Sequence, residues 1–175
     1  MTQPLKEHIR NVPDFPRKGI VFRDITPLLA DGKALAHACA TLAEPFRNER
    51  VELVVGAESR GFIFGVGVAR ELDCGFVPVR KPDKLPSKVI AAQYELEYGS
   101  DTLEMHTDAV RANQRVLLVD DLLATGGTMQ ACCRMVRQLD GLIVGIAFLI
   151  ELAFLGGRSK LGDYHIHSVI SYDCE

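Results

Sequence analysis

The chain contains 175 residues, of which 47% are hydrophobic and 25% are charged, and this is the size and composition of one globular domain with an adequate core. A net charge of −3 and an isoelectric point near 6.0 argue against nucleic acid as a partner, because a nucleic-acid-binding surface is usually basic. The first ten residues lack a signal-peptide core, and the apolar run at 142–150 is shorter than the about 20 residues of a membrane-spanning helix, so we expect no membrane partner. The five cysteines form no C-x-x-C pair, which favours a reduced, cytoplasmic protein.

The N-terminal part of the chain predicts short, irregular elements. Residues 4–10 favour a short helix, after which prolines and Gly19 interrupt any regular pattern. Residues 21–23 then alternate like a short β segment. An alanine-rich helix is expected over residues 34–46.

Five apolar runs predict strands that are buried on both faces. They lie at residues 51–55, 76–79, 116–119, 142–152 and 165–171. Helical patterns separate them, for example at about 62–72, and such alternation is typical of a parallel sheet. We therefore expect an α/β fold with a central parallel sheet of about five strands flanked by helices.

The run at 116–119 leads into a polar junction. Asp120 and Asp121 come first, then a turn rich in Gly and Thr at 124–128, then the pattern of an amphipathic helix. Unpaired backbone N–H groups and the helix dipole favour an anion at such a helix start. Gly126 and Gly127 allow the backbone to approach the ligand closely, and threonine hydroxyls add donors. The predicted ligand is a phosphate.

The two aspartates would lie beside this phosphate, because ligands bind at the carboxyl ends of parallel strands. Carboxylates accept hydrogen bonds from hydroxyls, so a ribose 5-phosphate fits the junction. The alternative is a capped strand-turn-helix with two solvated aspartates. A Walker A loop is excluded, since its lysine is missing.

A second polar junction, residues 56–61, follows the strand at 51–55 and lies at the same edge of the sheet. Spacing alone favours a simple helix cap, with Ser59 capping and Arg60 in solvent. Residues 80–106 also depart from the α/β pattern, and a connection this long in a compact domain is usually a lid or disordered. Alternation places Glu95 and Glu97 on one face of a β-ribbon, where either could be a solvated residue.

The run from 116 to 128 resembles the phosphoribosyl-pyrophosphate (PRPP) motif of type I phosphoribosyltransferases, and its form DDLLATGGTM is similar to that of the adenine-specific members of this family. The segments PDFPRKGIVFRDITPLL, ESRGF, RKPDKLP and LEYG occur in the order typical of the family. Glu58 departs from the usual aspartate but keeps its charge. The resemblance implies the type I phosphoribosyltransferase fold in a single domain, residues 1–175, with an N-terminal hood at about 1–32 and a flexible β-ribbon lid at about 80–106.

The resemblance also implies a reaction, in which adenine and PRPP give AMP and pyrophosphate in purine salvage, and a role for each matching residue. Contacts to phosphate and ribose are implied for Asp120, Asp121, Ala124, Thr125, Gly126, Gly127 and Thr128. Pyrophosphate contacts are implied for Glu58, Ser59, Arg60, Arg80, Lys81 and Lys84. Adenine contacts are implied for Val21, Phe22, Arg23 and Leu155, and Glu97 is the implied catalytic residue.

Further expectations rest on the resemblance as well. They are a cis peptide between Glu58 and Ser59, a homodimer, and Mg²⁺ that is carried by PRPP or pyrophosphate rather than ligated directly by the protein. Two alternatives stay open: a 6-oxopurine phosphoribosyltransferase, and a non-catalytic PRPP-sensing regulator, which would normally carry an added DNA-binding domain and a basic face. His165 and His167 share a strand face, but they lack a third candidate ligand, so ordinary strand histidines are favoured over a metal site.

Overall fold

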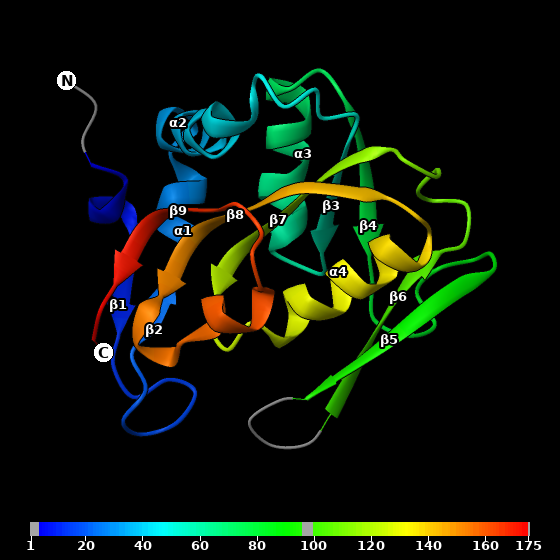
Figure 1. Ribbon diagram of the computed structural model, residues 1–175. Helices are drawn as coiled ribbons and strands as arrows, with labels where there is room; N and C mark the ends of the chain where they lie inside the picture. The colour runs from blue at the N-terminus through cyan, green and yellow to red at the C-terminus, as the bar shows by residue number, and fades with distance from the viewer. Residues whose placement is uncertain (1–3, 96–99, 175) are drawn as a thin grey trace.

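A computed structural model describes residues 4–95 and 100–174 of the chain. Its main sheet has five parallel strands in the order β4-β3-β7-β8-β9 (Figure 1). The strands are β3 (Leu53–Ala57), β4 (Gly75–Val79), β7 (Arg115–Leu123), β8 (Leu142–Leu152) and β9 (Ile166–Tyr172). The predicted α/β fold with a central parallel sheet is confirmed.

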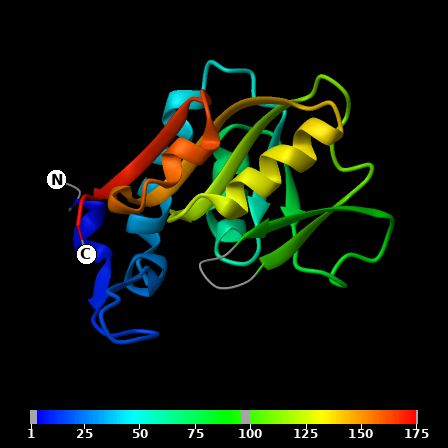
Figure 2. The same cartoon turned by 60° about the horizontal axis from the view of Figure 1, so that its bottom comes forward.

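Helices cover both faces of this sheet, as parallel strands require. On one face, α2 (Gly32–Ala43) and α3 (Gly61–Glu71) enclose a core that includes Val54 and Leu117. On the other face, α4 (Gly127–Gln138) encloses a second core that includes Val55 and Leu118 (Figure 2). Neighbouring residues of one strand thus enter different cores, because successive side chains point to opposite faces. Within the described part of the chain, no helix is long and apolar enough to cross a membrane.

Short elements at the N-terminus form a small separate layer. They are η1 (Leu5–His8), β1 (Arg10–Val12), β2 (Phe22–Asp24) and α1 (Thr26–Ala30), and β1 pairs with β2 in antiparallel fashion. The helix α1 was not predicted from the sequence. Two sequence features could have indicated this helix. The carboxylate of Asp24 accepts hydrogen bonds from the backbone N–H and the hydroxyl of Thr26, and Pro27 stands in the first turn. The alanine-rich helix ends at Ala43, and η2 (Glu44–Phe46) follows it.

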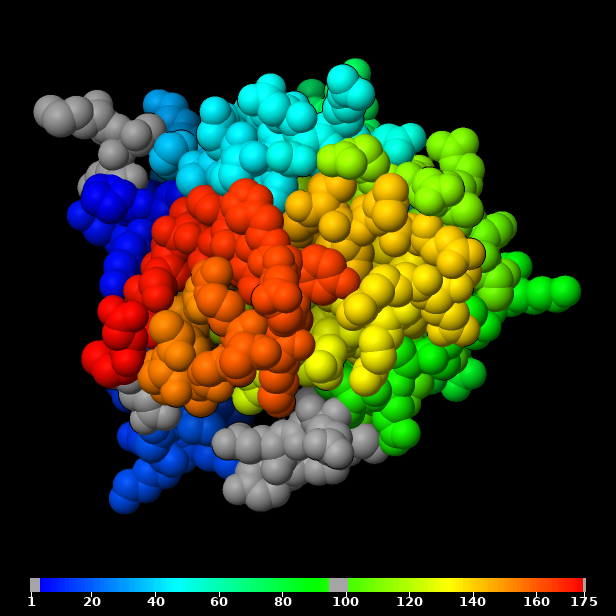
Figure 3. All heavy atoms as spheres, in the orientation of Figure 1, coloured from blue at the N-terminus to red at the C-terminus, as the bar shows by residue number. Residues whose placement is uncertain are grey.

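Arg23 ties this N-terminal layer to the other end of the chain. Its guanidinium donates to Oδ1 of Asn11 at 2.6 Å and lies 4.0 Å from the centre of the Tyr172 ring in β9. In Figure 3 the first and last described segments, blue and red, lie side by side. The two termini of the described chain therefore pack as one unit.

The described part of the segment at 80–106 contains a two-stranded β-ribbon. β5 (Val89–Glu95) and β6 (Ser100–His106) pair in antiparallel fashion, and Arg80 forms a β-bridge with Glu104. The buried residues Leu103 and Met105 belong to the core under α4. Strand structure thus begins at Val89, earlier in the chain than the alternation around Glu95 and Glu97 indicated. The proposed catalytic residue Glu97 lies outside the described residues.

Candidate active site

The two aspartates of the PRPP-like motif lie where β7 continues past its neighbour. β3 pairs with β7 only as far as Gly56 and Val119, whereas β8 pairs with β7 up to Leu123. We expected the aspartates at the end of the strand, but β7 runs two residues further because the long strand β8 provides partners there. One edge of β7 at the aspartates is therefore open to the loop that follows β3.

Asp120 and Asp121 are both buried, at 9% and 6% exposure. Burial raises the pKa of Asp120 well above its ordinary range, and the neighbouring charge of Asp121 raises it further. Burial also raises the pKa of Asp121, but the Arg60 guanidinium opposes that rise. The pair therefore combines one carboxyl that ionises with difficulty and one whose charge is compensated by an arginine.

Gly61, the first residue of α3, lies directly against Asp120. A Cβ added to Gly61 would lie 2.5 Å from Oδ1 of Asp120, which is closer than any real side chain approaches. The same Oδ1 accepts a hydrogen bond from the backbone N–H of Asp121 at 2.9 Å. Gly61 is therefore needed for the position of Asp120, a role that sequence spacing did not indicate.

The turn after β7, which the sequence predicts to be an anion cradle, leads directly into the start of α4. Gly126 adopts a left-handed conformation with φ of 80°, and the helix begins at Gly127, so its first N–H groups have no acceptor within the helix. Residues 120 and 122–128 line a cavity of about 70 Å³ together with Met129 and Phe148. A water molecule needs only about 10–15 Å³ on this measure, so a larger anion fits.

A distant glycine completes this cradle. An added Cβ on Gly157 would lie 2.1 Å from the carbonyl oxygen of Ala124, and one on Gly126 would lie 2.5 Å from the carbonyl oxygen of Gly157. Gly157 begins η4 (Gly157–Leu161), just after η3 (Ala153–Leu155). Sequence reasoning missed Gly157, because a backbone contact between segments more than 30 residues apart leaves no local pattern.

The second polar junction faces the aspartates. The Glu58–Ser59 peptide is cis, as the resemblance implied. Arg60 Nε lies 3.0 Å from Asp121 Oδ2, and no side chain caps the start of α3. The alternative of a Ser59 cap with Arg60 in solvent is therefore wrong, because the buried carboxylate of Asp121 draws Arg60 inward.

Glu58 accepts hydrogen bonds from two basic residues that follow β4. Its Oε2 accepts hydrogen bonds from Arg80 Nε at 3.2 Å and from the backbone N–H of Lys81 at 3.1 Å. Arg80 also donates to the carbonyl oxygen of Lys84 at 3.2 Å. A carboxylate cannot donate to an anion, so the geometry gives Glu58 the task of orienting Arg80.

Two of the residues expected to contact the base, Phe22 and Arg23, are neighbours in β2, so their side chains point to opposite faces of the strand. The half-buried Phe22 ring lies 5.5 Å from the Arg60 guanidinium, on the side of the aspartates. The Arg23 side chain points the other way, toward Asn11 and Tyr172, so Arg23 can reach a base only through its backbone. Val21 is half-buried just before β2, and Leu155 is exposed in η3, after β8.

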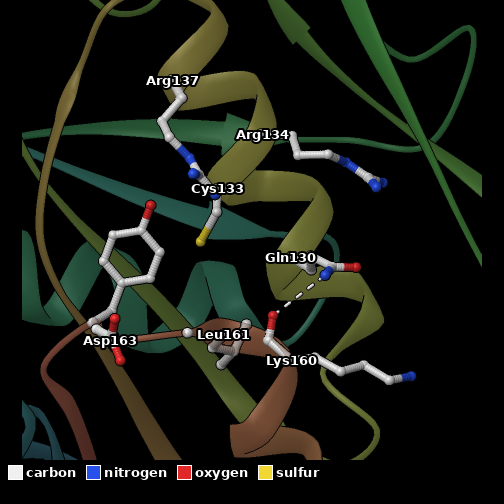
Figure 4. A pocket seen from close by; sticks show the side chains of 9 residues that line it. Gln130, Cys133, Arg134, Arg137, Lys160, Leu161 and Asp163 are labelled. Atoms are coloured by element: carbon white, nitrogen blue, oxygen red, sulfur yellow. Dashed lines mark hydrogen bonds between the residues drawn. The ribbon is translucent and has the colours of Figure 1, made fainter.

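Two other features do not belong to this site. A cavity of about 490 Å³ lies on the outer side of α4, where the side chains of Arg134 and Lys160 extend away from Arg137 rather than converge (Figure 4). His167 is half-buried in β9, and burial lowers its pKa. Residues 4–95 and 100–174 contain no group of three His, Cys, Asp or Glu residues that could hold a metal ion.

Carboxylates beside the start of a helix, at the carboxyl edge of a parallel sheet, are typical of proteins that bind phosphorylated ligands. Residues 28–171 match the family model described as phosphoribosyl transferase domain. The chain is 53% identical over 168 residues to the adenine phosphoribosyltransferase of Rhodopirellula baltica, covering 96% of this chain and 82% of that relative. It therefore belongs to the adenine phosphoribosyltransferase family.

Solved structures agree with this assignment. The adenine phosphoribosyltransferase of Thermoanaerobacter pseudethanolicus superposes with a TM-score of 0.93 at 51% identity, covering 96% of this chain and 98% of that one. The Saccharomyces cerevisiae enzyme, complexed with adenine and D-2,5-dideoxy-2,5-imino-altritol 1,6-bisphosphate, superposes with a TM-score of 0.87 at 41% identity, with coverage of 94% and 96%.

Proposed function

We propose that the protein transfers a 5-phosphoribosyl group from PRPP to adenine, giving AMP and pyrophosphate. The observation that carries this proposal is the juxtaposition of the cradle at Gly126 with the carboxylates of Asp120 and Asp121. The first suits the 5′-phosphate and the second suits the ribose hydroxyls. We assign the phosphate contacts to Ala124, Thr125, Gly126, Gly127 and Thr128.

Pyrophosphate leaves C1 of the ribose as N9 of adenine bonds to it, through an oxocarbenium-like state as in glycoside transfer. The negative charge on the departing pyrophosphate needs hydrogen-bond donors. We assign this task to Ser59, Arg60, Arg80, Lys81 and Lys84. Glu58 orients Arg80, as its 3.2 Å contact supports. The base then meets a positively polarised carbon from the opposite side.

We assign the base to the space beside Phe22, whose ring can stack on a purine. In this proposal the Val21 carbonyl accepts from the 6-amino group, the Arg23 N–H donates to N1, and Leu155 supplies an apolar wall. The Arg23 guanidinium donates to Oδ1 of Asn11 at 2.6 Å, which supports a base contact by the Arg23 backbone rather than by its side chain. Glu97, from the lid, addresses the imidazole edge of the base.

Mg²⁺ fits this site as an ion brought by PRPP. The described residues offer two adjacent carboxylates but no complete set of protein ligands, and Mg²⁺ usually keeps waters and substrate oxygens. When bound, the ion neutralises pyrophosphate charge in the transition state. Asp120 and Asp121 are the residues that could hold its waters.

We further propose a homodimer of single-domain subunits, each with a hood at about 1–32 and a lid at about 80–106. The outward face of α3 exposes Ile63 and Val66, at 40% and 51%, and a second copy of the chain would cover this apolar strip. The five cysteines are free, which supports a reducing, cytoplasmic setting.

A comparison of bases tests the proposed function. Hypoxanthine, guanine and xanthine present an acceptor and a donor where adenine presents a donor and an acceptor, so both backbone contacts become mismatched. Sites that read such groups discriminate by about 10⁴-fold. In the presence of PRPP and Mg²⁺, adenine should be the only one of these bases that gives strong pyrophosphate release. Comparable release with a 6-oxopurine would indicate a 6-oxopurine phosphoribosyltransferase. No release with any base would indicate a PRPP-sensing regulator.

A further inference from the structure

Glu151, near the end of β8, is a buried carboxylate that the proposed reaction does not use. It is only 7% exposed. Arg158 Nε donates to its Oε1 at 3.0 Å and Arg158 Nη2 donates to its Oε2, so the ion pair is bidentate. These hydrogen bonds lower the pKa of Glu151, which is therefore charged at neutral pH. The buried charge thus has a partner but no role in the chemistry.

The Arg158 guanidinium also binds β9. Its Nη1 donates to the carbonyl oxygen of Ile166 at 3.1 Å, and its Nη2 donates to Oγ of Ser168 at 3.3 Å. Because Arg158 belongs to η4, one side chain joins η4 to β8 and β9, the last two strands of the main sheet. A guanidinium presents its donors in a rigid planar fork, so these contacts also fix the position of the backbone that carries it.

Arg158 directly follows Gly157, the glycine that lies against the cradle. Gly157 is buried, whereas its neighbours on both sides are exposed. A Cβ on Gly157 would lie 2.1 Å from the carbonyl oxygen of Ala124 and 3.0 Å from the backbone nitrogen of Gly126. An exposed segment has few buried contacts of its own to maintain such a close approach. The fixed backbone of Arg158 supplies what the segment lacks.

The other end of η4 is held separately by α4. Gln130 Nε2 donates to the carbonyl oxygen of Lys160 at 3.3 Å (Figure 4), and the Leu161 side chain is buried in the core under α4. These contacts lie three and four residues beyond Gly157. Arg158 is therefore the tether nearest to the cradle.

We propose that Glu151 and Arg158 are positioning residues that hold Gly157 against Ala124 and Gly126, and so keep the cradle in the shape that binds phosphate. This inference rests on the proposed function, which places the 5′-phosphate in this turn. Neither side chain has to touch the ligand, because the effect passes through the backbone of Gly157. A binding site whose supporting contacts are loosened loses affinity.

The loop tied by this ion pair also carries Leu155, the proposed apolar wall of the base site. Two ligands distinguish an effect on the cradle from an effect on the base. Ribose 5-phosphate has the phosphate and the ribose but no base, whereas AMP has all three. If the ion pair acts on the cradle, both ligands should lose affinity by the same factor.

The double variant Glu151→Met with Arg158→Met tests the inference. Apolar residues of similar volume often replace a buried ion pair without loss of stability, and methionine cannot make the hydrogen bonds to β9. Calorimetry should show about 3- to 30-fold weaker binding of both ribose 5-phosphate and AMP. Thermal melts show whether the variant is folded.

Arg158→Lys is a second, milder variant, which keeps the charge but loses the planar fork. It should weaken both ligands by a smaller factor, and it decides the question if the double variant does not fold. Arg47→Lys is the matched control. The Arg47 side chain is 40% exposed, against 48% for Arg158, and it donates to Glu44 at 2.8 Å and to Glu71 at 2.9 Å, at the end of α3 that lies away from the cradle.

The control should bind both ligands like the parent, even if it melts at a lower temperature. Unchanged affinities in the folded Glu151 and Arg158 variants overturn the inference. A loss confined to AMP overturns it as well, because the ion pair would then act on the base. An equal loss in Arg47→Lys would reduce the ion pair to a general contribution to stability.

The parent protein distinguishes this inference from the proposed function. If it binds ribose 5-phosphate and AMP but does not turn over adenine, the proposed reaction fails, while the comparison of variants still decides the role of the ion pair. If it binds neither ligand, both are overturned.

Discussion

Arg60 Nε lies 3.0 Å from Oδ2 of Asp121, and the same guanidinium lies 5.5 Å from the centre of the Phe22 ring. One side chain thus connects the groups that we assign to pyrophosphate, ribose and base. The planar guanidinium can keep Asp121 on one edge while another edge binds a second anion.

Arg60→Lys should therefore impair the reaction although it keeps the charge. An ammonium is a point charge without the guanidinium's planar fork, so the variant loses a charge-assisted hydrogen bond, which corresponds to a fall of about 10- to 100-fold in kcat/KM for PRPP. Arg70→Lys, in the last turn of the helix α3 that follows Arg60, is the control and should behave like the parent. Steady-state assays of both variants decide this, and full activity of Arg60→Lys would remove Arg60 from the pyrophosphate site.

Asp120→Asn should stabilise the fold while it reduces activity. The folded state holds the Asp120 proton more tightly than the unfolded chain, where aspartate titrates at about 3.9. The stability present below that unfolded pKa is consequently lost as pH rises through the raised folded pKa. The amide imitates the neutral acid, so the variant should melt above the parent at pH 8.

Melting curves between pH 5 and 8 measure this gain in stability. For a chain of this size, an increase of about 1 kcal/mol in the free energy of unfolding raises Tm by about 2–4 °C. The difference between variant and parent should grow as pH rises. The exposed Asp163→Asn controls for the loss of one negative charge. A Tm difference that shrinks with rising pH would contradict a raised pKa for Asp120.

Gly126→Ala should distort the cradle. The new methyl group would lie 2.5 Å from the Gly157 carbonyl, in addition to the strain of φ at 80°. Gly162→Ala is a matched control, since Gly162 has φ of 66° with nothing within 4 Å. Calorimetry should show at least about tenfold weaker AMP binding for Gly126→Ala, in line with a loss of about 1.4 kcal/mol, and parent-like binding for Gly162→Ala. Equal affinities would mean that backbone approach at Gly126 does not form the phosphate site.

Glu97→Gln should slow turnover of adenine, because it keeps the shape of the side chain and removes its acid function. General acid–base assistance contributes about 10²- to 10⁴-fold. Glu95→Gln is the control on the same ribbon. Rates of AMP formation for the two variants test the assignment, and parent-like kcat for Glu97→Gln would make that glutamate a solvated residue.

Val66→Glu should dissociate the proposed homodimer by placing a charge in the apolar strip on α3. Leu142→Glu changes a similarly exposed apolar residue at the start of β8 and should leave assembly intact. Sedimentation equilibrium of the parent and both variants gives the masses. A monomeric parent, or a Val66→Glu dimer of unchanged stability, would rule out this interface.

The main sheet could be predicted because its central strands, β3, β7 and β8, are largely buried on both faces, whereas the edge strands β4 and β9 are mostly half-buried. Burial demands near-continuous apolar runs, and the run at 142–152 has the bounds of β8 itself. The end of β7 was set instead by pairing with the long β8, which a local pattern does not contain. The helix α1 escaped prediction because five residues carry too little periodicity.

The candidate site was predictable where motif residues are consecutive in sequence. The resemblance supplied Asp120, Asp121 and the turn after them, and the structure brings Arg60 to the same place. Gly61 and Gly157 were missed, because their roles depend on atoms of distant segments that touch them. Contacts of this kind exist only after folding.

The close approach between Gly61 and Asp120 also has an evolutionary consequence. A methyl group at position 61 meets the carboxylate at 2.5 Å, so neither position can be chosen independently of the other. A lineage that acquires alanine at position 61 must first shorten the side chain at position 120 or lose activity along the way. The two positions, one at the start of α3 and the other in β7, should therefore change together, and glycine at 61 should persist wherever aspartate is retained at 120.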